Sequence, residues 1–341
     1  MRVKRLLALL ACLTLCAASV ARARAEDAPQ PLYQGYARNR LTIHADMSRE
    51  SEAVGVYQQG ERVLITGVDP SWLKVAREER GAWQEGYVLR HSVVVSRALA
   101  DGVLPYGATP GAYTATLGRN VTLRSAPSER GGVLFTLTKG TRIAIVRIEN
   151  GWAQVIYWRQ YGYFPVSALE TLTPVYGADA ALEGDVVGAF VSFYTLPTTE
   201  DTINRLTNIR QACADIAVTV ASGKKFEFDA VAGPYNEGRG YAKAVAFANG
   251  GVVLGYGGGV CQVSSTLYNV LLALPGGIDI TYRRSHGPGG ATYLPHGVDA
   301  AVGNENLDLR FVNRFPFPIY IDAGAQDGVL YVALRRGGET Q

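Results

Sequence analysis

The first half of the chain consists of short runs in which apolar and polar residues alternate, separated by glycine, asparagine and proline. A period of two with frequent turn residues predicts short β-strands. The order of segments occurs twice, because Gly60 and Gly140 lie 80 residues apart and Trp72 and Trp152 are separated by the same interval. This repeat predicts two copies of a small β-barrel, each about 60 residues long.

Four segments of the second copy carry a recognisable pattern: Val121-Thr-Leu-Arg-Ser-Ala-Pro127, Lys139-Gly140-Thr141, Asn150-Gly151-Trp152 and Tyr161-Gly162-Tyr163. In this order they resemble bacterial SH3 domains. The first copy resembles a degenerate version, because Ile43-His-Ala-Asp46 replaces the usual Leu-Arg-Ser-x-Pro. We expect SH3-like domains at residues 31–97 and 111–170. The resemblance implies attachment to cell-wall peptide or to another ligand of the envelope.

The aromatic residues of the two copies have two interpretations, since they either line a ligand groove or fill the barrel core. We favour the core for the tryptophans, because a barrel of about 60 residues needs large buried side chains. The residues concerned are Trp72, Trp152, Tyr87 and Tyr163.

From Asp201 onward the apolar residues recur at spacings of three and four, which predicts a helix that Ser222-Gly223 closes. Residues 243–254 alternate loosely about Asn249-Gly250, and this predicts a hairpin. A second helix is predicted from Val260 to Leu274, where glycine and proline are absent. The mixture predicts an α+β domain, which we place at residues 186–335. The apolar face of the first helix comprises Leu206, Ile209, Cys213, Ile216 and Val220.

Cys261 lies at the start of the second predicted helix, directly after three glycines. The helix dipole and the free backbone N–H groups favour a thiolate at this position. Gly258 and Gly259 carry no side chain, so a substrate backbone could approach the sulfur. The free N–H groups and the Gln262 amide are candidate donors to an oxyanion. Ser264 is expected to cap or orient rather than to react.

A cysteine nucleophile needs a base, and the chain has four histidines. His44 and His91 fall in the barrel region, whereas His286 and His296 follow Cys261 by 25 and 35 residues. The other cysteine of this half, Cys213, is interpreted as a small buried hydrophobe. A disulfide between Cys213 and Cys261 is the alternative, and it would silence the Cys261 thiol.

A longer set of segments is far more specific than the spacing of one cysteine and one histidine: Gly257–Asn269, Arg284-Ser-His286, Tyr293-Leu-Pro295, Gly297–Val302 and Asp308–Asn313. Together they resemble the VanW family over residues 186–325. Some members are implicated as L,D-transpeptidases of peptidoglycan with this cysteine as nucleophile. The resemblance implies that Cys261 attacks a stem-peptide amide. It also favours His286 over His296 as the base, because position 296 is often not histidine in the family.

The substrate contacts are less determined than the nucleophile. Arg284 either grips a stem-peptide carboxylate or is a solvated charge. Asp299 either orients a histidine or caps a turn, and we favour turn capping. The candidate substrate-binding residues are Gly258, Gly259, Ser264, Arg284, Tyr293 and Asp299.

Three functions therefore stay open. The first is a cysteine acyl-transferase that cross-links peptidoglycan. The second is a cysteine peptidase or amidase that hydrolyses the same stem peptides. The third is a non-catalytic envelope-binding protein, in which Cys261 would be buried.

The first residues predict export. Arg2, Lys4 and Arg5 precede an apolar run from Leu6 to Val20, and Ala23-Arg24-Ala25 has the small-x-small pattern of a cleavage site. This order predicts a signal peptide over residues 1–25, cleaved after Ala25. The apolar run is about 15 residues long, short of the roughly 20 that span a bilayer. We expect a protein of the periplasm, cell wall or extracellular space, with peptidoglycan or its stem peptides as partner.

Charge and composition narrow the partners further. Residues 1–25 hold five of the 33 basic residues and no acidic one, so their removal changes the formal charge from +3 to −2. A nucleic-acid partner is not expected at this charge, nor is an integral membrane span after removal of the signal. The sequence offers no Cys/His metal-ligand spacing, and no Lys-Ser/Thr follows the glycine run. We therefore expect neither a metal nor a cofactor.

Overall fold

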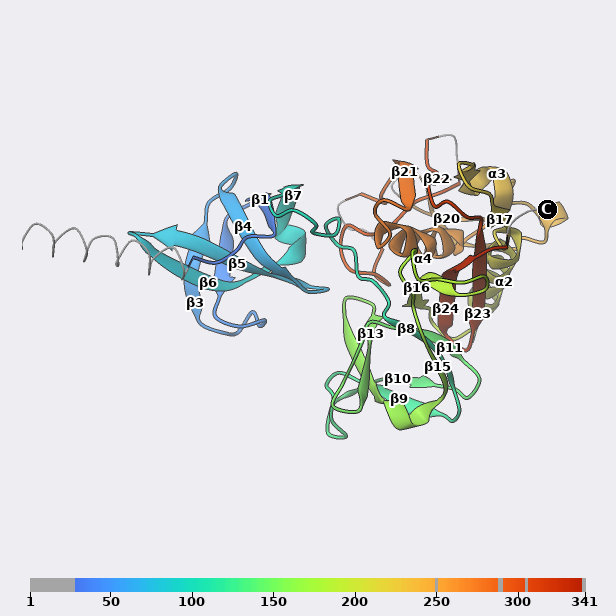
Figure 1. Ribbon diagram of the computed structural model, residues 1–341, viewed down its shortest axis with the longest axis horizontal. Coiled ribbons are helices and arrows are strands. Elements are labelled where there is room, and N and C mark those ends of the chain that lie inside the picture. The colour runs from blue at the N-terminus through green and yellow to red at the C-terminus, as the bar shows by residue number, and fades with distance from the viewer. Residues whose placement is uncertain (1–27, 249–250, 288–290, 304–305, 339–341) are drawn as a thin grey trace, which may run out of the picture. The chain divides into compact units, whose positions relative to one another are not determined.

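The structure is a computed structural model that describes residues 28–248, 251–287, 291–303 and 306–338 (Figure 1). The predicted signal peptide and the hairpin turn at 249–250 lie outside these residues. The chain divides into two units, residues 1–103 and 104–341, and each is described by itself. Within the described residues, no helix is long and apolar enough to cross a membrane.

The first unit contains one antiparallel sheet with the strand order β3-β2-β6-β5-β4-β1-β7. The predicted barrel is not closed here, because β3 and β7 are the two edges of this sheet and do not pair with each other. The core is aliphatic, with Ile65, Leu73 and Val88 fully buried. The strands are β1 (Tyr33–Ala37), β2 (Leu41–His44), β3 (Ala53–Tyr57), β4 (Arg62–Val68), β5 (Trp72–Glu79), β6 (Ala82–Leu89) and β7 (Val93–Ala98).

The second copy begins the second unit and repeats the strands of the first at the same offset, since β5 starts at Trp72 and the equivalent β13 at Trp152. Its strands form two sheets, β10-β9-β14-β13-β12 and β11-β8-β15, instead of one closed barrel. The strands are β8 (Tyr113–Leu117), β9 (Val121–Arg124), β10 (Val133–Leu137), β11 (Arg142–Ile145), β12 (Arg147–Glu149), β13 (Trp152–Tyr157), β14 (Gln160–Pro165) and β15 (Leu169–Pro174).

The tryptophans do not fill the cores of the two copies, so that part of the prediction is wrong. Trp72 and Trp152 are only half-buried. In the second copy, smaller aliphatic side chains and Phe164 occupy the interior instead. Each tryptophan is the first residue of its strand.

The α+β domain follows in the same unit. It contains a four-stranded antiparallel sheet, β16-β24-β23-β17, a three-stranded sheet, β18-β22-β21, and the hairpin β19-β20. The strands are β16 (Val186–Phe193), β17 (Thr219–Val220), β18 (Lys225–Glu227), β19 (Lys243–Ala248), β20 (Gly251–Tyr256), β21 (Ile278–Arg283), β22 (Leu309–Asn313), β23 (Ile319–Gln326) and β24 (Val329–Arg336), and the helices are α2 (Glu200–Asp215), α3 (Phe228–Ala232) and α4 (Val260–Leu272).

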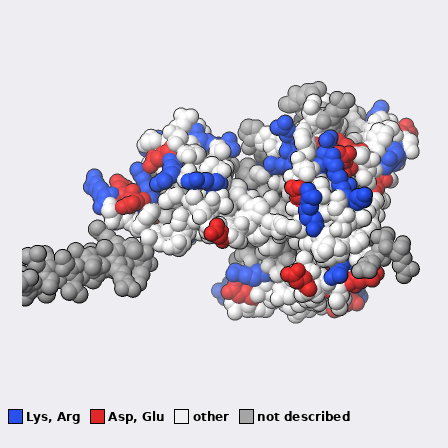
Figure 2. Space-filling model, turned by 45° about the horizontal axis from the view of Figure 1, so that its top comes forward, with Lys and Arg blue, Asp and Glu red and all other residues white. Residues whose placement is uncertain are grey.

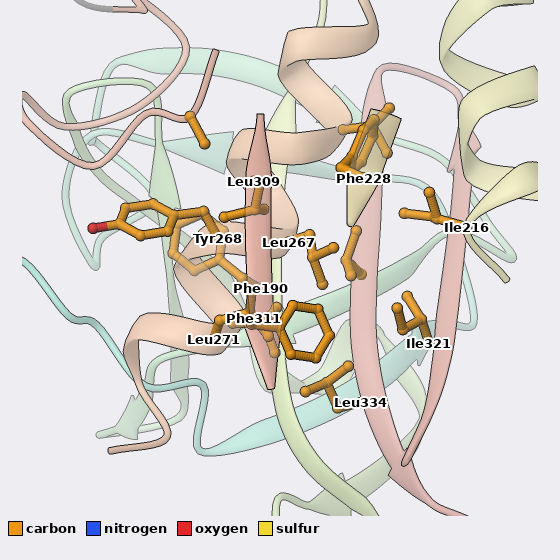
Figure 3. Packing of buried hydrophobic residues seen from close by; sticks show 14 of the residues in the cluster. Phe190, Ile216, Phe228, Leu267, Tyr268, Leu271, Leu309, Phe311, Ile321 and Leu334 are labelled. Atoms are coloured by element: carbon orange, nitrogen blue, oxygen red, sulfur yellow. The ribbon is translucent and has the colours of Figure 1, made fainter. Parts of the chain in front are cut away.

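Strands β16 and β24 are buried on both faces. Successive side chains of a strand point to opposite sides, so alternate residues of each strand enter two different hydrophobic cores. On one side, Phe190 and Leu334 join the cluster that contains α4, as Figure 3 shows for Phe190, Leu267 and Leu334. On the other side, Val191 and Tyr331 pack into the core of the second SH3-like copy. The two domains of this unit therefore share one sheet as a common wall.

The predicted helix from Asp201 is present, but it is shorter than the apolar pattern suggested. α2 ends at Asp215, and Val220 belongs to β17, where it pairs with Ile319 of β23. Val220 is buried in the same hydrophobic cluster as Ile209. The apolar spacing of three and four therefore extends beyond the end of α2, because the chain after the helix packs against the same core. The hairpin β19-β20 and the helix α4 agree with the sequence prediction.

Charged side chains are mixed in sign over the face that Figure 2 shows, with acidic and basic residues interspersed.

Candidate active site

Cys261 is the second residue of α4, and it follows a glycine linker from β20. Gly257 and Gly259 have φ values of +82° and +109°, which the linker needs in order to turn from the hairpin into the helix. The Cys261 side chain is partly exposed and its thiol is free. Cys213 is also a free thiol and is buried, so the alternative of a disulfide is wrong.

The glycines before Cys261 serve packing within the protein. A Cβ on Gly258 would lie 2.6 Å from the Val245 carbonyl oxygen, and one on Gly259 would lie 2.9 Å from Arg205 Cγ. The Gly258 carbonyl accepts a hydrogen bond of 3.0 Å from Asn208 Nδ2 of α2. Protein atoms thus fill the space in which a Cβ of Gly258 or Gly259 would lie.

The sulfur of Cys261 lies against the segment 298–303, which runs beside the first turns of α4. It contacts Val302 through the carbonyl oxygen at 3.4 Å and the backbone nitrogen at 3.5 Å. Two serines of α4, Ser264 and Ser265, donate to the Ala300 carbonyl at 2.7 and 3.1 Å. Ser264 is fully buried in this contact, so it holds the segment in place and does not bind a substrate as predicted.

His286 reaches Cys261 from the end of β21. Its imidazole interacts with the Cys261 side chain, and its Nδ1 is hydrogen-bonded to Asp299 Oδ2 at 2.7 Å. The His286 side chain is 22% exposed, whereas that of Asp299 is 2% exposed. Cysteine, histidine and aspartate therefore form one connected set, with the carboxylate at its buried end.

Asp299 orients the histidine, so the prediction that favoured turn capping is wrong. Its carboxylate also accepts the His286 backbone N–H at 2.7 Å and lies 3.4 Å from an Arg283 Nη2. The sequence could not decide this role, because His286 and Asp299 are 13 residues apart in the chain and meet only through the tertiary fold.

The pKa values reflect this geometry. The hydrogen bonds with Asp299 and with Cys261 raise the pKa of His286 to about 10, against the opposing effect of burial. For Asp299, burial by itself would raise the pKa, but the hydrogen bonds from His286 and the Arg283 charge outweigh it and hold the pKa below its usual value. At neutral pH the pair is therefore an imidazolium on a carboxylate, and the positive ring adjoins the sulfur.

Gln262 does not have the role that the sequence suggested. It is buried, and its amide nitrogen donates to Ser192 Oγ at 3.1 Å and to the Phe193 carbonyl at 3.0 Å. Its amide oxygen accepts from Arg205 Nη2 at 3.0 Å. Since both hydrogens of the amide are engaged, Gln262 ties α4 to β16 and is not free to donate to an oxyanion. In the first helical turn, the Val260 and Gln262 N–H groups donate to the Gly257 and Gly259 carbonyls at 3.0 and 2.9 Å, so these two groups are also engaged within the protein.

Of the two remaining predicted substrate-binding side chains, Tyr293 lies at the site and Arg284 lies at the surface. Tyr293 is half-buried in the cluster that includes Cys261, and burial together with the nearby Cys261 charge raises its pKa. Arg284 is exposed, and its guanidinium contacts the Tyr282 side chain at 3.3 Å. Both interpretations of Arg284, a solvated charge and a grip on a stem-peptide carboxylate, are compatible with this exposed position.

Sequence reasoning missed a second carboxylate beside the site. Asp229 accepts a hydrogen bond from the Tyr235 hydroxyl through Oδ1 and one from the Gly303 backbone nitrogen at 2.9 Å through Oδ2. Tyr235 packs against the cluster that includes Cys261. Asp229 thus anchors the residue that follows Val302, the neighbour of the sulfur. Only the Gly-Pro-Tyr-Asn turn at 233–236 could have signalled it. Within the described residues, no three or more His, Cys, Asp or Glu side chains are grouped so that they could hold a metal ion.

Alkylation is expected to distinguish the two thiols. Burial raises the pKa of Cys213 to about 12, whereas the Cys261 sulfur is partly exposed beside an imidazolium. In protein lacking residues 1–25, iodoacetamide at neutral pH should label Cys261 and leave Cys213 unmodified until the protein is denatured. Peptide mass spectrometry after a brief reaction measures this. Labelling of both thiols at equal rates, or of neither, would contradict the arrangement described above.

Comparison with known proteins identifies two domains. Residues 204–335 match the family described as VanW like protein, and residues 119–170 match the one described as bacterial SH3 domain. Over 115 residues the chain is 36% identical to YoaR of Bacillus subtilis (strain 168), a match covering 34% of this chain and 37% of YoaR. Over 117 residues it is 22% identical to the putative N-acetylmuramoyl-L-alanine amidase YrvJ of the same organism, covering 34% of this chain and 22% of YrvJ.

The chain thus spans little more than a third of YoaR and about a fifth of YrvJ. Among solved structures, NlpC1 from Trichomonas vaginalis is 13% identical, with 92% of this chain and 95% of that chain covered and a TM-score of 0.17. A NlpC/P60 family protein from Bacillus cereus ATCC 10987 is 10% identical, with 89% and 99% covered and a TM-score of 0.17.

Proposed function

We propose that this chain, which carries a VanW-like domain at residues 204–335 and a bacterial SH3 domain at residues 119–170, is an exported cell-wall protein that transfers acyl groups between peptidoglycan stem peptides. The observation that carries the proposal is the position of His286, whose Nδ1 is hydrogen-bonded to Asp299 at 2.7 Å and whose ring interacts with the Cys261 side chain. A nucleophile, a proton carrier and an orienting carboxylate in this order are what acyl transfer requires.

The first half of the reaction follows from the charges of the set. The Cys261 thiolate attacks the carbonyl carbon of a stem-peptide amide, and the dipole of α4 favours the negative charge that develops at its N-terminal end. As the carbon–nitrogen bond breaks, the leaving amine takes a proton from the His286 imidazolium, and a thioester on Cys261 remains. Asp299 keeps the ring oriented and stabilises its positive charge.

The second half restores the enzyme. An acceptor amine attacks the thioester carbonyl and loses a proton to His286, and the sulfur leaves as thiolate. The product is a new amide, which is a cross-link when the amine belongs to a second stem peptide. The resemblance to VanW members favours this transfer. The raised pKa of His286 makes the ring the proton donor of the first step, in addition to the base that the sequence suggested.

Hydrolysis of the same thioester is the second candidate, because water can replace the acceptor amine. The match to YrvJ, whose name denotes a putative peptidoglycan amidase, favours it. Incubation of purified muropeptides with the protein separates the two. Transfer produces new dimers, whereas hydrolysis only shortens stems, and chromatography with mass spectrometry distinguishes them. If neither product forms, the acyl-transfer proposal is wrong.

The dependence on pH should follow His286. Because its folded pKa is about 10 and its ordinary value 6.5, the charged pair stabilises the fold fully below pH 6.5, and this stabilisation is lost as pH rises toward 10. The difference in unfolding free energy between the wild type and His286→Asn should shrink over this range. Urea denaturation at several pH values measures it. A difference that grows with pH would contradict the raised pKa.

A further inference from the structure

The turn between β13 and β14 has a backbone conformation that its sequence does not favour. Tyr157 pairs with Gln160, so the turn consists of Trp158 and Arg159 alone. Trp158 has a φ of +54°, a value that glycine adopts freely and a bulky side chain rarely adopts. Strained positions of this kind cluster at functional sites.

The other two-residue hairpin turns with a positive φ provide an internal comparison. Within the described residues, the remaining non-glycine residues with positive φ are Arg80, Asn150 and Asp327. Each is followed by a glycine, as the common hairpin turns require. Among these positions Trp158 is the aromatic one, and no glycine follows it.

The duplication sharpens this comparison. The hairpin β5-β6 of the first copy corresponds to β13-β14 of the second, and its turn is Arg80-Gly81. The equivalent hairpin of the first SH3-like copy therefore has a turn with glycine at its second position, which this backbone conformation favours. The unfavourable Trp158-Arg159 turn occurs in the copy that shares a unit with the VanW-like domain, which indicates a role at that domain.

Contacts of Arg159 locate the turn beside the candidate active site. Arg159 Nη2 lies 3.4 Å from the Ala291 carbonyl oxygen. Burial lowers the pKa of this half-buried arginine, and the charge of Asp299 opposes that effect, so the guanidinium lies within electrostatic reach of the carboxylate that holds His286. The segment 291–299 thus carries Asp299 and Tyr293 and also receives the SH3 turn.

Trp158 itself is arranged as a platform. Its ring stacks on Tyr157 with centroids 5.3 Å apart and an interplanar angle of 6°. Tyr157 is buried and its hydroxyl donates to the Leu134 carbonyl at 3.1 Å, so the support is rigid. Trp158 remains 43% exposed. A flat aromatic surface that is held in place in this way can stack on the apolar face of a sugar ring.

We propose that the Trp158–Arg159 turn is a saccharide subsite of the Cys261 centre, in which the indole stacks on a sugar ring of the glycan that bears the stem peptide. Arg159 is a positioning residue that docks the turn on segment 291–299. The inference rests on the proposed function, and it assigns the SH3 domain a direct part in substrate binding.

Calorimetric titration of the Cys261→Ala protein tests the subsite without turnover. Two ligands are compared, a stem peptide alone and the same peptide on its disaccharide. Trp158→Gly removes the indole and relieves the positive φ, so the variant should fold with an unchanged or higher melting temperature. Its affinity for the disaccharide-bearing ligand should fall about tenfold, while its affinity for the peptide stays within about twofold.

A matched control is Trp83→Ala, since Trp83 is a tryptophan of the first unit with a similar exposure of 38%, and it should change neither affinity. Equal losses for both ligands after Trp158→Gly, or no loss for either, would overturn the subsite. Failure of the proposed function would give a different result. The wild type would then form neither dimers nor shortened stems from muropeptides, whereas the titrations would still show whether Trp158 contributes to binding of the disaccharide.

Discussion

Replacing Cys261 with alanine is expected to abolish the conversion of muropeptides while the domain stays folded. The sulfur is the atom that would carry the acyl group, so its loss should reduce the rate by about 10⁴-fold or more, to the background of the assay. The side chain is only partly buried, so the unfolding free energy should change by less than about 1 kcal/mol. Product chromatography and urea denaturation measure the two effects.

Cys213→Ala is the matched control, because it removes the same atom from the core. Cys213 is buried in the main cluster of the domain, so the substitution should lower the unfolding free energy by about 1 kcal/mol and leave the rate unchanged. The two variants should therefore show opposite patterns. Activity that survives Cys261→Ala, or that disappears with Cys213→Ala in folded protein, would exclude Cys261 as the nucleophile.

Replacing Asp299 with asparagine is expected to lower the rate about 10³- to 10⁴-fold, the size of effect seen when an orienting carboxylate of a triad is neutralised. The amide oxygen can still accept one hydrogen bond, but it has no charge to hold the imidazolium. The pKa of His286 should fall, since its bond to Asp299 is the largest cause of the increase. Nuclear magnetic resonance titration of His286 reads this change independently of activity.

The same substitution should also cost stability. Asp299 is a buried carboxylate paired with His286 and Arg283, and removing one partner of a buried charge pair costs about 3 kcal/mol. Asp279→Asn, on β21, is the control: its ion pair with Arg314 is half exposed, so the loss should stay below about 1 kcal/mol. Equal effects of the two substitutions on rate would contradict the orienting role.

Much of the local structure could be predicted from sequence because its causes are local. The spacing of apolar residues predicted α2, the lack of glycine and proline predicted α4, and Asn249-Gly250 predicted the hairpin β19-β20. The position of Cys261 at a helix start followed from the same pattern, and the segments of the VanW-like and SH3 families were recognisable. The preference for His286 also came from the sequence, through the family resemblance.

The roles of the polar residues depended on contacts between distant parts of the chain, and these only the tertiary structure decided. Gln262 and Asn208 are neighbours of β16 and of the glycine linker in space, not in sequence. Asp299 meets His286 because segment 298–303 packs along α4, where buried serines hold its backbone. The chain itself therefore determined which residue types surround the thiol, whereas the packing of α4 against this segment decided which of them touch it.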